Sequence, residues 1–169
     1  IACTGIDARI AESVHDFGAS PMLSGRGSYL ASVAANFLFR KIGRKWRVTL
    51  DDEVVEDEFA LVSMCNGRYY GGGMMPTPNQ NRLGLNRSLS VMVFFGSSKL
   101  KTLAIFPSIF KGEHINHRHN IKVLCGHEIT VRFDRPTPLQ IDGETILGVT
   151  EYTVRAAEDA ACADIEAAE

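Results

Sequence analysis

Two carboxylate residues, Asp142 and Glu144, flank a single glycine late in the chain, directly after an apolar, strand-like run. Asp-Gly is a strong signal for a two-residue β-hairpin turn, because glycine readily adopts a positive φ angle. Such a turn would hold both carboxyl groups at one rigid tip, where one of them could act as a general base. The same residues also suit an ordinary hairpin turn without a chemical role, so this pattern alone leaves both interpretations open.

Four residues elsewhere are candidates for ligand binding: Asp7, Arg26, Asn66 and Gly67. Asp7 stands where a short helix is expected to begin, so its carboxylate could bind free backbone N–H groups or serve only as an N-cap. Arg26 lies between two glycines and could contact a phosphate bidentately, unless it is an exposed loop arginine without a role. Asn66 and Gly67 open a glycine-rich segment whose backbone could pass close to a ligand or to a neighbouring strand.

The composition is typical of a single globular domain. The chain has 169 residues, of which 45% are hydrophobic, and a formal net charge of -2. This length allows a sizeable buried core, and the charge gives no indication of nucleic-acid binding. There is no run of about 18 apolar residues and no signal peptide, so we expect a cytoplasmic protein that neither spans a membrane nor is secreted.

The cysteines and histidines do not predict a metal site. The four cysteines are far apart and form no Cys-x-x-Cys pair, as expected for reduced cytosolic thiols. His114, His117 and His119 are close enough in sequence to suggest zinc, but they have no cysteine partner nearby. We therefore predict solvated loop histidines and no bound metal.

Longer helices are expected at two places. Residues 28–42 carry apolar side chains at the i, i+3, i+4 spacing of a helix that buries one face. A second helix is expected to begin near Ser98, to be interrupted at Pro107 and to end at Lys111. The Ala- and Glu-rich tail, residues 156–169, is expected to be a surface helix or a frayed end.

The other apolar segments predict strands. Residues 46–50 alternate apolar and polar, and an acidic turn leads from them into a buried strand over 58–66, so a hairpin is expected. Further strands are expected over residues 89–95, 120–124 and 128–133, and in a hairpin from 139 to 155. Mostly antiparallel strands with two or three helices place the chain in the α+β class, as a β-sandwich-like domain.

The segments that could do chemistry also carry a resemblance to a known family. They are Gly5-Ile6-Asp7-Ala8, the glycine-rich stretch 66–79, residues 110–115 and the Asp-Gly-Glu turn. In this order and spacing they resemble the C-terminal domain of bacterial diacylglycerol kinases and YegS-type lipid kinases, relatives of the sphingosine kinases. The resemblance covers nearly the whole chain and implies a lipid-kinase domain over residues 1–155, with a tail over 156–169.

This resemblance implies a partner domain. In the family, an N-terminal nucleotide-binding domain carries a Gly-Gly-Asp-Gly-Thr phosphate loop, and that motif does not occur here. Because the chain also begins with Ile1 inside an apolar segment, we expect a fragment that is inactive by itself. The complete protein is expected to use ATP and Mg²⁺ at the membrane surface, and to transfer the γ-phosphate to a hydroxyl of a diacylglycerol-like lipid.

The resemblance also assigns roles to residues. Glu144 is expected to be the proton acceptor and Asp142 its orienting or metal-directed neighbour, while Asp7 is expected to face the cleft between the domains. Kinases of this kind usually hold a structural Mg²⁺ with an acidic stretch after the glycine-rich segment. The matching residues here include Asn86 and Arg87 and no carboxylate, so we predict that this metal site is lost.

Other interpretations stay open. The chain could be a noncatalytic lipid-binding or interaction module that keeps the fold, or, more remotely, a domain like that of the NAD kinases with different nucleotide-binding residues. An open strand edge could also pair two copies into a homodimer. A phosphate loop encoded upstream of Ile1 would favour the kinase.

Overall fold

The structure is a computed structural model, and it describes residues 1–5, 43–70, 73–83, 88–96, 98–157 and 163–168. The helix expected over residues 28–42 lies outside these ranges. So do two of the candidate binding residues, Asp7 and Arg26, and both predictions therefore stay untested.

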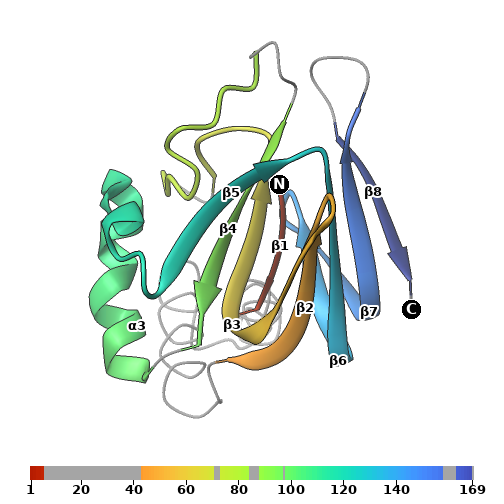
Figure 1. Cartoon of the computed structure of the whole chain (residues 1–169), viewed down its shortest axis with the longest axis horizontal. Helices are drawn as coiled ribbons and strands as arrows, with labels where there is room; N and C mark the ends of the chain where they lie inside the picture. Colours follow the sequence, from red (N-terminus) through yellow and green to blue (C-terminus); the bar gives the residue numbers. More distant parts are fainter. Residues whose placement is uncertain (6–42, 71–72, 84–87, 97, 158–162, 169) are drawn as a thin grey trace, which may run out of the picture.

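One antiparallel sheet dominates the fold (Figure 1). Its eight strands are β1 (Ala2–Gly5), β2 (Arg44–Leu50), β3 (Glu53–Cys65), β4 (Leu89–Phe95), β5 (Ile121–Gly126), β6 (Glu128–Ile141), β7 (Glu144–Ala156) and β8 (Ala163–Ala168). The helical elements are α3 (Lys99–Ile105) and the 3-10 helices η1 (Phe106–Lys111) and η2 (Glu113–Asn116). The path across the sheet is β5-β4-β3-β1-β6-β7-β8, and β2 pairs with β3 and β6.

Strands β1 and β2 lie one after the other between β3 and β6. Gly5 of β1 pairs with Leu61, and Arg44 of β2 pairs with Phe59 only two residues away on β3. Both strands use the same edge of β3, because Phe59 also pairs with Phe95 of β4 on the opposite edge. Along β6, in the same way, β2 is followed by β1. The two short strands thus act as one composite strand at the centre of the sheet.

Glycines stand where β1 ends and β2 begins. Gly5 and Gly43 have φ angles of 106° and 107°, a region that side-chain-bearing residues rarely adopt. At Gly5 the reason is also steric, because a Cβ atom there would lie 2.3 Å from the carbonyl oxygen of Ala60. The close approach of β1 to β3 therefore requires glycine at this position.

The sheet separates two hydrophobic cores. Between its inner faces, Trp46 packs edge-on against Phe133 at a centroid distance of 5.3 Å, and Phe133 lies 5.8 Å from the ring of Tyr152. On the outer face of β3 and β4, a second cluster joins residues such as Met92 to Ile105 of α3. This folding of one sheet around an inner core, with a helix over one outer face, fits the predicted β-sandwich-like class (Figure 1).

Several local predictions are confirmed. The acidic turn joins β2 to β3, with Asp51 at a positive φ of 49°. The hydroxyl of Ser98 caps α3 by accepting a hydrogen bond from the Lys101 N–H. Pro107 ends the α-helical geometry, and Gly112 closes η1 in the left-handed conformation.

Three predictions about elements are corrected. The described residues contain one α-helix, fewer than the two or three expected. Residues 163–168 form β8 rather than a helix or frayed end, because the open edge of β7 offers backbone partners that outweigh the helical propensity of alanine and glutamate. Strand β6 runs continuously through Pro136 and Pro138, whereas two separate strands were expected, one ending at residue 133 and one beginning at residue 139. The β6–β7 register shifts between Arg132 and Leu139, so the two prolines, which have no N–H, need not donate hydrogen bonds to β7.

Replacement of Gly5 tests the central position of β1. Gly73 has the same positive φ range, at 107°, but no atom of the described chain lies within 4 Å of a Cβ placed there. Gly73→Ala is therefore expected to lose only about 1–3 kcal/mol of stability, which is the cost of holding alanine at a positive φ. Gly5→Ala adds overlap with the Ala60 carbonyl, so urea unfolding should show a clearly larger loss of stability, or no folded protein. Equal losses in the two variants would contradict the packing of β1 against β3.

Candidate functional site

The two candidate catalytic carboxylates lie at the tip of the β6–β7 hairpin, as predicted. Ile141 pairs with Glu144, and the two intervening residues, Asp142 and Gly143, have φ angles of 47° and 103°. Positive φ at both central positions is the type I′ turn, whose twist matches that of the flanking strands. Both carboxylate side chains reach solvent, and that of Asp142 is 75% exposed. The tip is a rigid, solvent-facing mount.

The pairing of β1 brings a second set of candidates to the same end of the sheet. Ala2 pairs on one edge with Met64, two residues before Asn66, and on the other edge with Ile141, directly before Asp142. Neighbouring strands are about 4.8 Å apart, so the end of β3 and the hairpin tip are separated by roughly 10 Å across β1. Asn66 and Gly67 therefore emerge at the same end of the sheet as the carboxylates, although they are far from them in sequence.

Ile1, the residue directly before β1, ties the tip in place. The Ile1 nitrogen lies 2.5 Å from Oδ1 of Asp142, and the Asp142 N–H donates a 3.1 Å hydrogen bond to the Ile1 carbonyl oxygen. A backbone amide N–H at the Ile1 nitrogen can donate this hydrogen bond to Asp142 just as a free amino group can. These two contacts orient Asp142 toward β1, while Glu144 stands on the other side of the turn, at the start of β7.

Buried polar residues brace the loop that follows β3. Thr77, which is fully buried, donates a 2.9 Å hydrogen bond to the Gly67 carbonyl oxygen. Arg68 donates to the carbonyl oxygen of Gln80, and the Gln80 side chain, itself buried, contacts the Ser90 hydroxyl of β4 at 2.5 Å. Sequence reasoning missed Thr77 and Gln80, because polar residues in a Gly- and Pro-rich segment have the same pattern as an exposed loop.

The same loop is joined to the helical layer through His114. This side chain is fully buried, and its Nε2 lies 2.8 Å from the Pro76 carbonyl oxygen. The neighbouring Met75 N–H donates to the carbonyl oxygen of Ile109 in η1. The prediction of a solvated histidine is thus wrong for His114, whose buried ring connects η2 to the loop. His117 and His119 are exposed, as expected.

Burial also changes the titration of His114. Removal from water lowers the pKa of this imidazole below its usual 6.5, and the nearby His117 adds to the effect, although the Pro76 carbonyl opposes it. The folded protein therefore holds His114 neutral more firmly than the unfolded chain does. The Nε2 hydrogen bond to the Pro76 carbonyl can form in either protonation state, so the cost at low pH comes from burying a charged ring.

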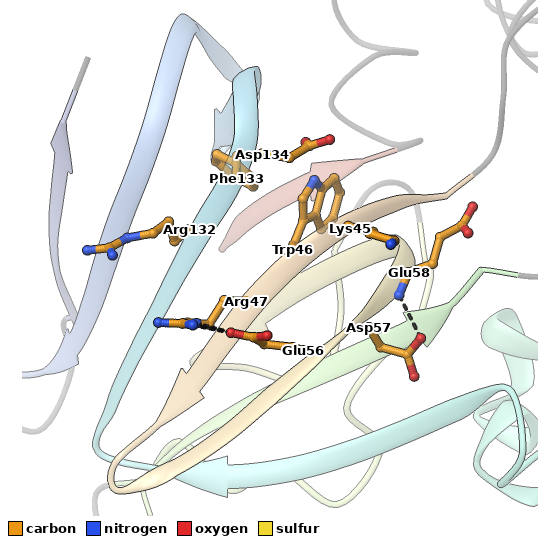
Figure 2. A pocket seen from close by; sticks show the side chains of 9 residues that line it. All are labelled: Lys45, Trp46, Arg47, Glu56, Asp57, Glu58, Arg132, Phe133 and Asp134. Atoms are coloured by element: carbon orange, nitrogen blue, oxygen red, sulfur yellow. Dashed lines mark hydrogen bonds and ion pairs between the residues drawn. The ribbon is translucent and has the colours of Figure 1, made fainter.

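A wide depression lies elsewhere, on β2, β3 and β6 (Figure 2). Its volume is about 640 Å³, and it is lined by Lys45, Trp46, Arg47, Glu56, Asp57, Glu58, Arg132, Phe133 and Asp134. Arg47 is engaged by Glu56, and Figure 2 shows Arg132 and Asp134 pointing away from each other. The charged groups do not converge on a common point, so no chemistry follows from them.

Metal binding finds no support within the described ranges. They contain no group of three or more His, Cys, Asp or Glu side chains arranged to hold a metal ion. Asn86 and Arg87, on which the predicted loss of the structural Mg²⁺ site depends, are outside those ranges, so that prediction is untested. In the same ranges, no helix is long and apolar enough to cross a bilayer.

Comparison with known proteins decides the family. The profile described as "YegS C-terminal NAD kinase beta sandwich-like domain" matches residues 1–160. The chain belongs to this family. Diacylglycerol kinase from two strains of Mycobacterium tuberculosis, CDC 1551 / Oshkosh and ATCC 25618 / H37Rv, is 32% identical to it over 118 residues. That alignment covers 68% of this chain and 36% of each relative, so the chain corresponds to about a third of their length.

Solved structures agree on the fold of this YegS-type domain. One structure described as a diacylglycerol kinase of Bacillus anthracis str. Sterne superposes with a TM-score of 0.59 at 18% identity, covering 90% of this chain and 48% of that one. A second from the same organism gives 0.53 at 21% identity, covering 83% and 44%. These likenesses bear on the fold of the domain, which is the β-sandwich-like class predicted from sequence.

The burial of His114 makes the stability of the domain depend on pH. Because the pKa of His114 is lower in the folded state, its contribution to stability is complete above about pH 6.5 and is lost as the pH falls below that value. Urea unfolding should show lower stability at pH 5.5 than at pH 7.5. His114→Gln should reduce this difference, whereas the exposed control His119→Gln should retain it. An unchanged difference in His114→Gln would contradict the assignment.

Proposed function

We propose that this domain is the substrate side of a lipid kinase, which transfers the γ-phosphate of ATP to a hydroxyl of a diacylglycerol-like lipid. The observation that supports the proposal is the register of β1, because Asp142 and Glu144 lie at the same end of the sheet as Asn66 and Gly67. The family and the names of its relatives support it. The nucleotide-binding half would come from a separate N-terminal domain, and this chain alone would be inactive.

Glu144 is the proposed proton acceptor. Phosphoryl transfer to an alcohol needs a carboxylate within hydrogen-bond reach of the hydroxyl, together with positive charge around the moving phosphoryl group. Glu144 is exposed on a rigid turn and can accept the hydroxyl proton once the lipid is bound. Asp142, which is already oriented by its contacts with Ile1, would keep the turn in position and direct a hard oxygen ligand toward the metal that accompanies ATP.

The loop after β3 would bind the polar part of the substrate. The Asn66 side chain carries amide donors and an acceptor, and the Gly67 backbone allows close approach because it has no side chain. The hydrogen bonds of Thr77 and Gln80 fix the conformation of this loop, so a bound head group would meet a preformed surface. Asp7 and Arg26 are proposed as further contacts to the head group or the nucleotide phosphates.

The exposure of the tip agrees with an incomplete active site. A carboxylate in bulk water is a poor catalyst, because water screens its interaction with the transferring group. Closure of a nucleotide-binding domain over the tip would exclude water there. We propose that the complete enzyme acts in the cytoplasm at the membrane surface. If two copies pair by strand addition, they would use β5 or β8, which stand at the two ends of the described sheet.

Substitution of Glu144 tests the proposal in the full-length protein. Glu144→Gln keeps the size of the side chain but removes the proton acceptor, so radiolabelled phosphate transfer from ATP to a diacylglycerol panel should fall by at least about 100-fold in kcat, as for other general bases. KM for the lipid should change little, since a glutamine side chain has nearly the same shape as glutamate. Asp142→Asn should reduce activity less, through the position of the turn.

A second hairpin provides the matched control. Asp52 is an exposed carboxylate at the β2–β3 turn, so Asp52→Asn should leave transfer unchanged. Equal activity of Glu144→Gln and the parent protein would remove Glu144 as the base. If the full-length protein bound lipid but transferred no phosphate from ATP, the noncatalytic lipid-binding module would be the better account.

A further inference from the structure

The helical layer presents an unusually apolar outer face. In the continuous segment formed by α3 and η1, Leu100 is 81% exposed, Leu103 is 53% exposed and Phe110 is 46% exposed. The opposite side of the same segment is buried in the outer core through residues such as Ile105 and Ile109. Sequence pattern alone did not separate these two sets, since all of them are large apolar residues in one predicted helix.

Basic residues flank this apolar face. With successive residues about 100° apart around α3, Leu100, Leu103 and Ala104 form the centre of the exposed face. Lys99 and Lys101 then stand on its two sides, and Lys111 follows Phe110 at the end of η1; all three lysines are exposed. From Ser98 to Gly112 the segment contains no acidic residue.

This combination favours a lipid bilayer over a second copy of this chain. A helix with exposed leucines at the centre and lysines on both sides can bury its apolar residues at the acyl boundary while the ammonium groups reach anionic head groups. A second copy meeting this face about a two-fold axis would bring lysines against lysines, with no acid in the segment to neutralise them. Charge complementarity therefore selects an anionic surface as the occupant.

We propose that the outer face of α3 and η1 docks this domain onto membranes that contain anionic lipids. The helix would lie in the plane of the interface, with Leu100, Leu103 and Phe110 inserted and the three lysines at the level of the head groups. The inference does not depend on catalysis, since it concerns a surface distinct from the carboxylate tip. It specifies which part of the molecule meets the bilayer.

A continuous set of contacts connects this face to the candidate site. Ile109 of η1 accepts a hydrogen bond from Met75, and Thr77 of the same loop holds the Gly67 carbonyl. Figure 1 shows this loop between the upper end of the helical layer and the start of β1. A docked helix would therefore hold the loop that carries Asn66 and Gly67 in a fixed relation to the membrane surface.

Vesicle binding of the full-length protein tests the proposal without nucleotide. Sedimentation with phosphatidylcholine vesicles containing about 30% phosphatidylserine should show binding that weakens on removal of the anionic lipid and on addition of salt. Leu100→Ser with Leu103→Ser should lower the partition coefficient at least about tenfold. Replacing Lys99, Lys101 and Lys111 by Gln should lower it about fivefold per lysine on anionic vesicles, and have little effect on neutral ones.

Controls separate this surface from general effects. Leu83→Ser removes an equally exposed leucine outside the face, and Lys45→Gln an exposed lysine on β2; neither should change binding. Since Leu100 and Leu103 are exposed, their variants should melt at the parent temperature. Absence of parent binding, or equal binding by the parent and the Leu100/Leu103 variant, would overturn the proposal. It would also be overturned if that variant changed only the oligomeric mass, because the face would then be a dimer interface.

The two proposals can fail independently. Vesicle binding requires no ATP, so it is unaffected by the outcome for Glu144. Conversely, a short-chain diacylglycerol that is dispersed in water should be phosphorylated equally by the parent and by the Leu100/Leu103 variant.

Discussion

The pairing of β1 on both of its edges is the constraint on which the rest of the structure depends. This strand has four residues, and all of them are buried between β3 and β6. Backbone groups buried in this way must be hydrogen-bonded, since each unpaired one would cost about 1–3 kcal/mol. The register that pairs these backbone groups also fixes how β3 and β6 are aligned along the sheet, since Met64 and Ile141 both pair with Ala2. The Asn66 loop and the Asp142–Glu144 tip consequently leave the sheet at the same end.

The two faces of the sheet pack against different parts of the molecule. The inner face is packed with aromatic and branched side chains around Trp46 and Tyr152, and this packing makes β6 and β7 a stiff support for the hairpin tip. The outer face of β3 and β4 is covered by α3 and η1, which bury one side and expose the other. The loop after β3 is hydrogen-bonded both to β4, through Gln80 and Ser90, and to η1. Site and proposed docking surface are thus connected through one loop.

Local chemistry explains which features could be predicted from sequence. The Asp-Gly turn, the acidic turn at Asp51, the Ser98 cap and the apolar strand β4 each depend on a few adjacent residues, and all are found as expected. The two catalytic candidates could be placed on a rigid tip for the same reason. That Asn66 emerges at the same end of the sheet could not be predicted, because no periodicity links segments so far apart.

Tertiary contacts explain what could not be predicted. β1 is too short to show a period, and its burial depends on two partners that are distant in sequence. β8 overrides a helical composition because an open strand edge was available. His114 was assigned to solvent since its partner, the Pro76 carbonyl, lies 38 positions away. Thr77 and Gln80 were missed for a similar reason, as most of their partners are backbone atoms that carry no sequence signal.

Long-range contacts of Ala2 provide the most direct test of this account. In NMR spectra of the isotopically labelled protein, nuclear Overhauser effects should connect the backbone of Ala2 to Met64 and also to Ile141, since β1 lies between both strands. Contacts to both residues would establish that the loop after β3 and the carboxylate tip share one end of the sheet. Contacts to only one of them, or to neither, would contradict the central position of β1 and with it the proposed site.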